Sequence, residues 1–179
     1  MELIYTQAIQ PESLVQQAAR GNAEAFGVLV RENEQLLFSV AAAYFQDPGD
    51  RADAVQEALL TAWHRIGTLR EGAFFRTWLV RILINRCKSI LRKKRPLPLE
   101  EEQAARLAGP SADAGPRLDV HRALALLDEK TRLAAVLYYM EGCSLGETAE
   151  ILRIPEGTAK SRLYRARQQL KKELKEYDE

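Results

Sequence analysis

Residues 144–170 have the sequence SLGETAEILRIPEGTAKSRLYRARQQL, and this stretch decides the fold that we predict for the C-terminal part of the chain. Ser144 stands three residues before Glu147, the spacing of a capping box at a helix start. Ile154-Pro155 then breaks the helix, and Pro155 suits the entry to a second helix, where a missing N–H costs little. We expect the inward side of the first helix to carry Leu145, Ala149 and Leu152. The pattern therefore predicts a helix-turn-helix.

The second of these helices has an apolar side and a basic side. Its apolar stripe, at spacings of three and four residues, consists of Ala159, Leu163, Ala166, Leu170 and Leu174. The opposite side carries Lys160, Ser161, Tyr164, Arg165 and Gln168. A solvated helix with cations favoured near its carboxyl end explains Lys171 and Lys172, but not Lys160 in the first turn. We therefore interpret this helix as one that recognises duplex DNA, with base contacts near its start and phosphate contacts further along.

A second basic stretch is RILINRCKSILRKKR, residues 81–95, which has seven Lys and Arg and no acid in a chain of net charge +1. If residues 78–92 are helical, one stripe about 17 Å long carries Arg81, Asn85, Lys88 and Arg92, with Ser89 beside it. The opposing face carries Leu79, Leu83, Cys87 and Ile90 and would pack inward. The helix dipole favours cations near the end but does not explain Arg81. The amide of Asn85 adds no charge, yet it can hydrogen-bond a base edge, so we predict a nucleic-acid contact.

The remainder of the chain has the 3.6-residue period of helices and almost no strand signal. We expect helices over residues 12–20 and 23–45, the second capped by Asn22 and ended by the turn at residues 47–50. A third helix should carry Val55, Leu59, Ala62, Trp63, Ile66 and Leu69 on one face. Prolines gather in residues 96–117, which we interpret as a flexible linker. The sequence therefore predicts an all-α chain of two small helical domains, residues 1–95 and 118–179.

Other classes of protein find little support in the sequence. No apolar run reaches the length of a membrane span, and the N-terminus lacks the pattern of a secretory signal. Two cysteines without a CxxC pair indicate free thiols in a reducing cytoplasm. His64 and His121 belong to no catalytic or zinc motif, so we expect no catalytic residue, no metal, no cofactor and no enzyme activity.

The chain resembles the extracytoplasmic-function sigma factors, the small two-domain promoter-specificity subunits of bacterial RNA polymerase. Three segments carry the resemblance, and they follow each other in the order typical of that family. DAVQEALLTAW, residues 53–63, is similar to the polymerase-binding helix of that family. FRTWLVRILINRCKSILRKKRP, residues 75–96, is similar to the segment that melts and recognises the −10 element. Residues 126–170 resemble the domain that recognises the −35 element. The resemblance covers nearly the whole chain outside the linker.

The resemblance implies a role for individual residues. Asp53, Gln56 and Glu57 would dock on the clamp helices of core RNA polymerase, whose flap would also bind the chain. Contacts to the −10 element would come from Arg76, Arg81, Asn85, Lys88, Ser89 and Arg92, with Asn85 at a base flipped out of the non-template strand. Contacts to the −35 duplex would come from Thr158, Lys160, Ser161, Tyr164, Arg165 and Gln168. The resemblance further implies restraint by an anti-sigma factor and no membrane insertion.

Two other interpretations stay open at this stage. A stand-alone helix-turn-helix regulator would bind paired operator half-sites by itself, and a helical adaptor would bind acidic proteins without salt-sensitive DNA affinity. A linker of about 20 flexible residues has a root-mean-square span of roughly 25–30 Å. Two promoter elements two helical turns apart lie ~70 Å from each other. A chain that binds both elements thus needs a partner that holds the linker extended, so we expect weak specific DNA binding by the isolated chain.

Overall fold

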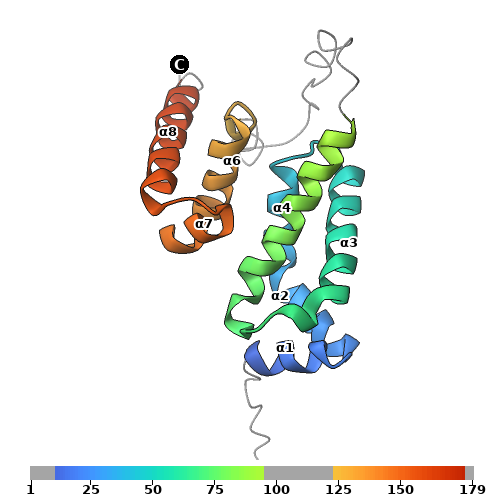
Figure 1. Ribbon diagram of the computed structural model, residues 1–179. Helices are drawn as coiled ribbons and strands as arrows, with labels where there is room; N and C mark the ends of the chain where they lie inside the picture. The colour runs from blue at the N-terminus through green and yellow to red at the C-terminus, as the bar shows by residue number, and fades with distance from the viewer. Residues whose placement is uncertain (1–10, 95–122, 176–179) are drawn as a thin grey trace, which may run out of the picture.

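The computed structural model describes residues 11–94 and 123–175, and within these ranges every regular element is helical (Figure 1). The first range contains α1 (Pro11–Ala19), α2 (Ala23–Ala42), α3 (Pro48–Arg65) and α4 (Phe75–Lys94), with single 3-10 turns η1 (Ile66–Thr68) and η2 (Gly72–Phe74) before α4. The second contains α6 (Glu129–Ala135), the π-helical turn η4 (Val136–Met140), α7 (Leu145–Leu152) and α8 (Glu156–Lys175). The predicted all-α fold with two helical regions is confirmed, whereas the predicted linker at 96–117 lies outside the described residues.

Local capping sets where the first helices begin. The side chain of Asn22 accepts from the backbone N–H of Glu24 and Ala25 at 3.0 and 3.1 Å, as predicted for an N-cap. The turn at residues 47–50 was expected to end the preceding helix, but it starts α3 instead, with Asp47 as N-cap and Pro48 in the first turn. The preceding helix ends at Ala42, and Arg51 of α3 donates to the carbonyls of Phe45 and Gln46 in the connection between the two helices.

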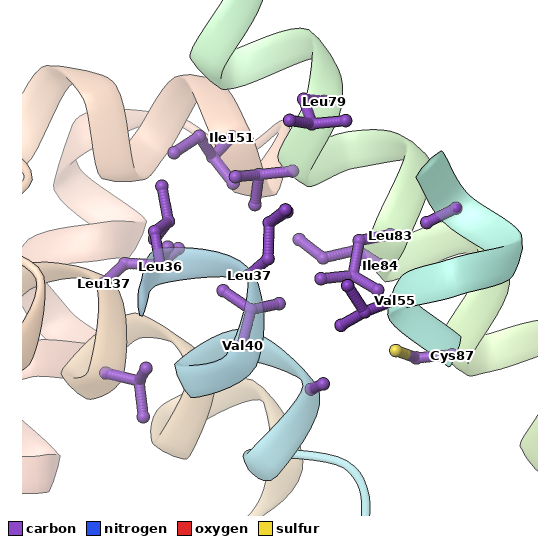
Figure 2. Close-up of a cluster of buried hydrophobic side chains, with 14 of the residues drawn as sticks. Leu36, Leu37, Val40, Val55, Leu79, Leu83, Ile84, Cys87, Leu137 and Ile151 are labelled. Atoms are coloured by element: carbon purple, nitrogen blue, oxygen red, sulfur yellow. The ribbon is translucent and has the colours of Figure 1, made fainter. Parts of the chain in front are cut away.

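The N-terminal domain buries the facing sides of α2, α3 and α4. Figure 2 shows Leu37 and Val40 of α2 pointing toward Leu83 and Ile84 of α4, with Val55 of α3 beside them. Seven of the large side chains in this cluster are almost fully buried: Leu29, Leu37, Val40, Leu79, Val80, Leu83 and Cys87. At the edge, the rings of Phe26 and Trp63 meet edge-on with centroids 5.2 Å apart. Burial of one face of α4 fixes which side chains its other face presents.

The C-terminal domain packs against α2 and α4 of the first domain (Figure 1). Leu137 of η4 lies beside Leu36 of α2, and Ile151 of α7 belongs to the same buried cluster (Figure 2). A polar contact joins the domains where Arg132 donates to the carbonyl of Ala43 at 3.1 Å. The two helical regions thus share one continuous core.

Within the C-terminal domain, the buried side of α7 differs from the prediction in part. Ala149 is buried as expected, but its buried neighbours are Thr148 and Ile151, while Leu145 and Leu152 are only half-buried. The shift arises because α7 packs against α4 as well as against α8, so that its apolar side is turned toward the other domain.

Candidate nucleic-acid and polymerase interfaces

The basic stripe of α4 faces away from the core, as the helical period predicted. Leu79, Leu83 and Cys87 are fully buried on the opposite side, and Ile90 is half-buried. Asn85, Lys88 and Arg92 are exposed, and Ser89 beside them is half-buried. Burial raises the pKa of the Cys87 thiol to about 12, so this cysteine is an uncharged packing residue.

One member of the stripe already has a partner in the other domain. The guanidinium of Arg81 donates through both Nε, at 3.2 Å, and Nη2 to the main-chain carbonyl of Glu150 in α7. Its Nη2 also lies 3.7 Å from a carboxylate oxygen of the same glutamate. Between α4 and α7 a small hollow of about 70 Å³ is lined by Arg81, Ile84, Asn85, Lys88, Ile151, Leu152 and Arg153. The stripe therefore faces the helix-turn-helix.

Arg76 is set apart from the stripe. It precedes Arg81 by five residues, so its side chain projects about 140° away around the helix. It is half-buried and donates to the main-chain carbonyl of Glu141 at 3.2 Å. Just upstream, the ring of Phe74 is 43% exposed whereas Phe75 is buried, with its ring centroid 6.0 Å from that of Trp78. Arg76 thus contacts the C-terminal domain.

The first helix of the helix-turn-helix has the capping that its sequence predicted. The hydroxyl of Ser144 accepts from the N–H of Glu147, and the Glu147 carboxylate accepts from the N–H of Ser144, which forms a complete capping box. These hydrogen bonds lower the pKa of Glu147. The turn that follows α7 places Arg153 at a φ of 54°, a left-handed conformation that costs a non-glycine residue energy. On α8, Ala159, Leu163 and Ala166 are buried.

All proposed −35 contacts lie together on the solvent side of α8. The exposed residues are Thr158, Lys160, Ser161, Tyr164, Arg165 and Gln168, and the side chain of Tyr164 is 62% exposed. The hydroxyl of Ser161 donates to the carbonyl of Gly157 at 2.9 Å, which holds it against the helix. This surface is an open polar and basic face with one aromatic ring at its centre.

The structure adds a pair that sequence reasoning missed. The phenol oxygen of Tyr139, after α6, accepts from Nε and Nη2 of Arg167 on α8 at 3.3 and 3.2 Å. Its ring packs edge-on against Tyr138 with centroids 5.1 Å apart, and both tyrosines are partly exposed. Arg167 lies seven residues after Lys160, on the same edge of α8. Adjacent tyrosines are a sequence signal, but nothing local indicated that Arg167 is their partner.

The predicted polymerase face lies on α3, on the side of α4 that is remote from α7 (Figure 1). Asp53 and Gln56 are exposed, but half-buried Glu57 accepts from Arg86 of α4 in an ion pair. Beside them, α2 and α3 enclose a largely apolar hollow of about 480 Å³, lined in part by Phe26, Val30, Phe38, Gln56, Leu60 and Trp63. Phe38 and Leu60 are 40% and 56% exposed. An apolar groove thus accompanies the predicted polar contacts.

Among the described residues, no three His, Cys, Asp or Glu side chains cluster in a way that could hold a metal ion. Cys87 and Cys143 are both buried and free of disulfide bonds. None of the described helices has the length and apolar character that crossing a bilayer demands.

Comparison with known proteins shows the family to which the chain belongs. Residues 29–96 match Sigma-70 region 2, and residues 117–170 match Sigma-70 region 4. The chain is 35% identical over 151 residues to the ECF RNA polymerase sigma factor SigM of Mycobacterium tuberculosis, an alignment covering 84% of this chain and 77% of the relative. It belongs to the ECF sigma factor family.

Other relatives cover both domains of the ECF sigma factor fold. The RNA polymerase sigma-H factor of Pseudomonas aeruginosa is 30% identical, with 92% of this chain and 94% of the relative aligned. Among solved structures, CnrH in complex with the cytosolic domain of CnrY has a TM-score of 0.73 and 31% identity, covering 93% of this chain and 98% of that one. The sigma factor RpoE bound to the anti-sigma factor NepR from Bartonella quintana has a TM-score of 0.71 and 27% identity, covering 86% and 98%.

The family decides between the alternatives that the sequence left open. Sigma factors are subunits that give RNA polymerase its promoter specificity, and matches to regions 2 and 4 account for both helical regions of the chain. The chain is therefore a promoter-specificity factor and not a stand-alone regulator or an adaptor for acidic proteins.

Proposed function

We propose that this sigma factor divides promoter recognition between its two basic helices, with α4 holding a melted strand and α8 recognising the upstream duplex. The observation that carries the proposal is that both helices bury an apolar side, while Asn85, Lys88 and Arg92 of α4 and the predicted contacts of α8 are exposed. The two surfaces differ in chemistry, and this difference supports two different tasks.

On α4, the proposed strand contacts are Arg81, Asn85, Lys88 and Arg92, with Ser89 at the edge. A narrow cationic stripe follows a single sugar–phosphate backbone, and an amide at its centre can hydrogen-bond an unstacked base. Extruding a base costs a few kcal/mol, which these contacts must offset. We assign the base contact to Asn85 and the phosphate contacts to the cations. Arg76, which contacts the other domain, would reach a strand only after that contact breaks.

On α8, the exposed face suits the major groove of duplex DNA. Lys160, Ser161 and Tyr164 lie near the start of the helix, where a recognition helix approaches base edges. Arg165 can bind guanine through two hydrogen bonds, and Gln168 can contact a base or a phosphate. Thr158, in the first turn, lies closest to the DNA backbone in such a docking. The face therefore suits recognition of the −35 element.

On α3, we propose that Asp53 and Gln56 contact the clamp helices of core RNA polymerase, with Glu57 at the edge of that contact. The adjoining apolar hollow would receive side chains from the same partner, because interfaces combine an apolar centre with a polar rim. We also propose a contact between the C-terminal domain and the polymerase flap, and an anti-sigma partner such as the one bound to the similar RpoE structure. We also propose that the protein acts in the cytoplasm, together with the polymerase.

The test is a run-off transcription assay with core RNA polymerase and a genomic promoter library, with and without this protein. We expect promoter-specific transcripts only when the sigma factor is present, together with its co-purification with core enzyme. Absence of both a specific transcript and co-purification would contradict the proposed function. Specific binding of duplex operators by the chain alone, without any effect on polymerase, would do the same.

A further inference from the structure

The pair of Tyr139 and Arg167 joins the π-helical turn η4 to the recognition helix α8. The phenol oxygen of Tyr139 accepts from Nε of Arg167 at 3.3 Å and from Nη2 at 3.2 Å. Both residues are exposed, and Tyr139 keeps 43% of its surface in contact with solvent. The pair is therefore accessible to a partner that approaches α8 from solvent.

These hydrogen bonds leave donors available on both residues. Arg167 occupies the acceptor lone pairs of the Tyr139 oxygen, so the phenol O–H has to point to another acceptor. The guanidinium uses one N–H of Nε and one of Nη2 in the pair, which leaves Nη1 and the second N–H of Nη2. That outer edge of a guanidinium can bind two oxygens of a phosphate through parallel hydrogen bonds. The unused donors of the pair thus match the acceptors of a phosphodiester.

Arg167 lies at one edge of the proposed duplex-binding face of α8. It follows Lys160 by seven residues and Tyr164 by three, which places the three exposed side chains on one stripe. Exposed Lys171 continues the stripe to a length of about 17 Å from Lys160. A helix about 10–12 Å across fills a major groove about 12 Å wide, so its edges meet the phosphate backbones. The pair therefore faces a backbone and not the base edges.

The packing of η4 holds the phenol in position beside α8. Val136 and Leu137, in the same turn, are buried in the core. The ring of Tyr139 meets that of Tyr138 edge-on, with centroids 5.1 Å apart and an angle of 89° between the planes. Tyr139 in turn holds the guanidinium of Arg167. Both groups are thus placed before a ligand arrives, which lowers the entropy cost of binding.

We infer that Tyr139 and Arg167 form a composite phosphate site, in which the guanidinium and the phenol O–H together bind one phosphodiester of duplex DNA beside the −35 element. The inference rests on the proposed function, because that function brings α8 into the major groove. It also assigns η4 to the DNA interface, since this turn supplies one of the two donor groups. A phosphate bound there fixes the register of α8 along the groove and adds no sequence preference.

The first test uses the full chain without polymerase and a labelled duplex of mixed sequence, with affinity measured by anisotropy over a range of salt concentrations. Arg167→Gln should lower the slope of log affinity against log salt by about 0.9 and weaken binding at least about tenfold near 50 mM salt, as loss of one phosphate contact requires. Lys130→Gln, an exposed charge-matched change on α6, should leave the slope unchanged. An unchanged slope in Arg167→Gln, or an equal fall in Lys130→Gln, would overturn the inference.

Tyr139→Phe tests the phenol by itself. It keeps the ring and the charge of Arg167, so the salt slope should stay the same while affinity falls roughly threefold to tenfold, the size of one lost hydrogen bond. Tyr138→Phe is the matched control, because the two guanidinium bonds end on its neighbour. A pair that only braced α8 against η4 would lower the melting temperature of Tyr139→Phe and leave its DNA affinity unchanged, and that result would overturn the inference.

A second test locates the phosphate in the holoenzyme bound to a promoter that it transcribes. Single phosphates across the upstream element are replaced, one at a time, by neutral methylphosphonates. One replacement should weaken binding by the wild-type holoenzyme and not by Arg167→Gln, because the variant already lacks the contacting charge. Absence of such coupling at every position would overturn the inference. A failed transcription assay would contradict the proposed function, whereas the duplex measurements need no polymerase and test the phosphate site separately.

Discussion

Arg86 of α4 donates to the carboxylate of Glu57 on α3, which links the helix predicted to bind polymerase with the helix predicted to bind DNA. Lys94 and Asp50 form a second ion pair between the same helices, at the carboxyl end of α4, with a distance of 2.6 Å. The side chains of Arg86 and Glu57 are 36% and 44% exposed, so solvent screens the pair. We therefore expect the ion pair to contribute little to the free energy of unfolding and to act mainly by orienting α4 on α3.

The first prediction concerns this ion pair. Glu57→Gln and Arg86→Gln should each lower stability by about 0.2–1 kcal/mol, and the double variant should lose less than the sum of the two. Thermal unfolding of the four proteins of the cycle measures this coupling. If Glu57 acts on polymerase only through α4, Arg86→Gln should reduce core affinity as much as Glu57→Gln does. A loss confined to Glu57→Gln would instead identify a direct contact.

A second prediction separates the two DNA-binding helices. Asn85→Ala should impair promoter opening by the holoenzyme more than closed-complex formation, because the amide contacts a base only after strands separate. Arg165→Ala should weaken binding to the upstream element, with a loss of about 1–3 kcal/mol if a base contact is removed. Permanganate footprinting measures opening, and gel retention measures the closed complex. Equal losses at both steps for both variants would contradict the division of labour.

The third prediction concerns the pair of Arg167 and Tyr139. The phenol holds the guanidinium at the edge of α8, where a recognition helix in the major groove lies close to a phosphate strand. Arg167→Gln should weaken holoenzyme binding uniformly across upstream sequences and lower the salt slope by about one. Tyr139→Phe keeps the charge and should leave the slope unchanged while weakening binding less. Arg31→Gln, an exposed change on α2, is the charge-matched control. An unchanged slope in Arg167→Gln would exclude the phosphate contact.

The fourth prediction is a pH dependence at the capping box. Hydrogen bonds from Ser144 lower the pKa of Glu147 below its usual 4.5, so the charged form stabilises the folded state. That stability is fully present above the unfolded-state pKa and is lost as the pH falls through the lower folded-state value. Glu147→Gln should flatten this part of the melting-temperature profile below about pH 4.5 and change little in its shape at neutral pH. Ser144→Ala should cost about 1 kcal/mol at neutral pH. A profile identical to wild type would refute the assignment.

Most of what the sequence predicted correctly depends on interactions within a few residues. The caps at Asn22 and Ser144 and the buried face of α4 follow from spacing along one helix. The contact of Arg81 with Glu150 joins residues 69 positions apart, and that of Arg86 with Glu57 joins residues 29 apart. Such pairs depend on how whole helices pack, which no local pattern contains. For the same reason the sequence indicated the basic stripe but not that α7 lies across it.

The fifth prediction concerns the apolar hollow between α2 and α3. Leu60 is 56% exposed there, so Leu60→Gln removes little buried surface and should change stability by no more than about 0.5 kcal/mol. The same change should weaken core polymerase binding, because an apolar side chain at the centre of an interface contributes more than one at its rim. Leu126→Gln is a matched control, since Leu126 is 65% exposed in the other domain. Competition for core polymerase against a labelled wild-type chain measures the effect. An affinity of Leu60→Gln equal to that of the wild-type chain would show that polymerase does not use this hollow.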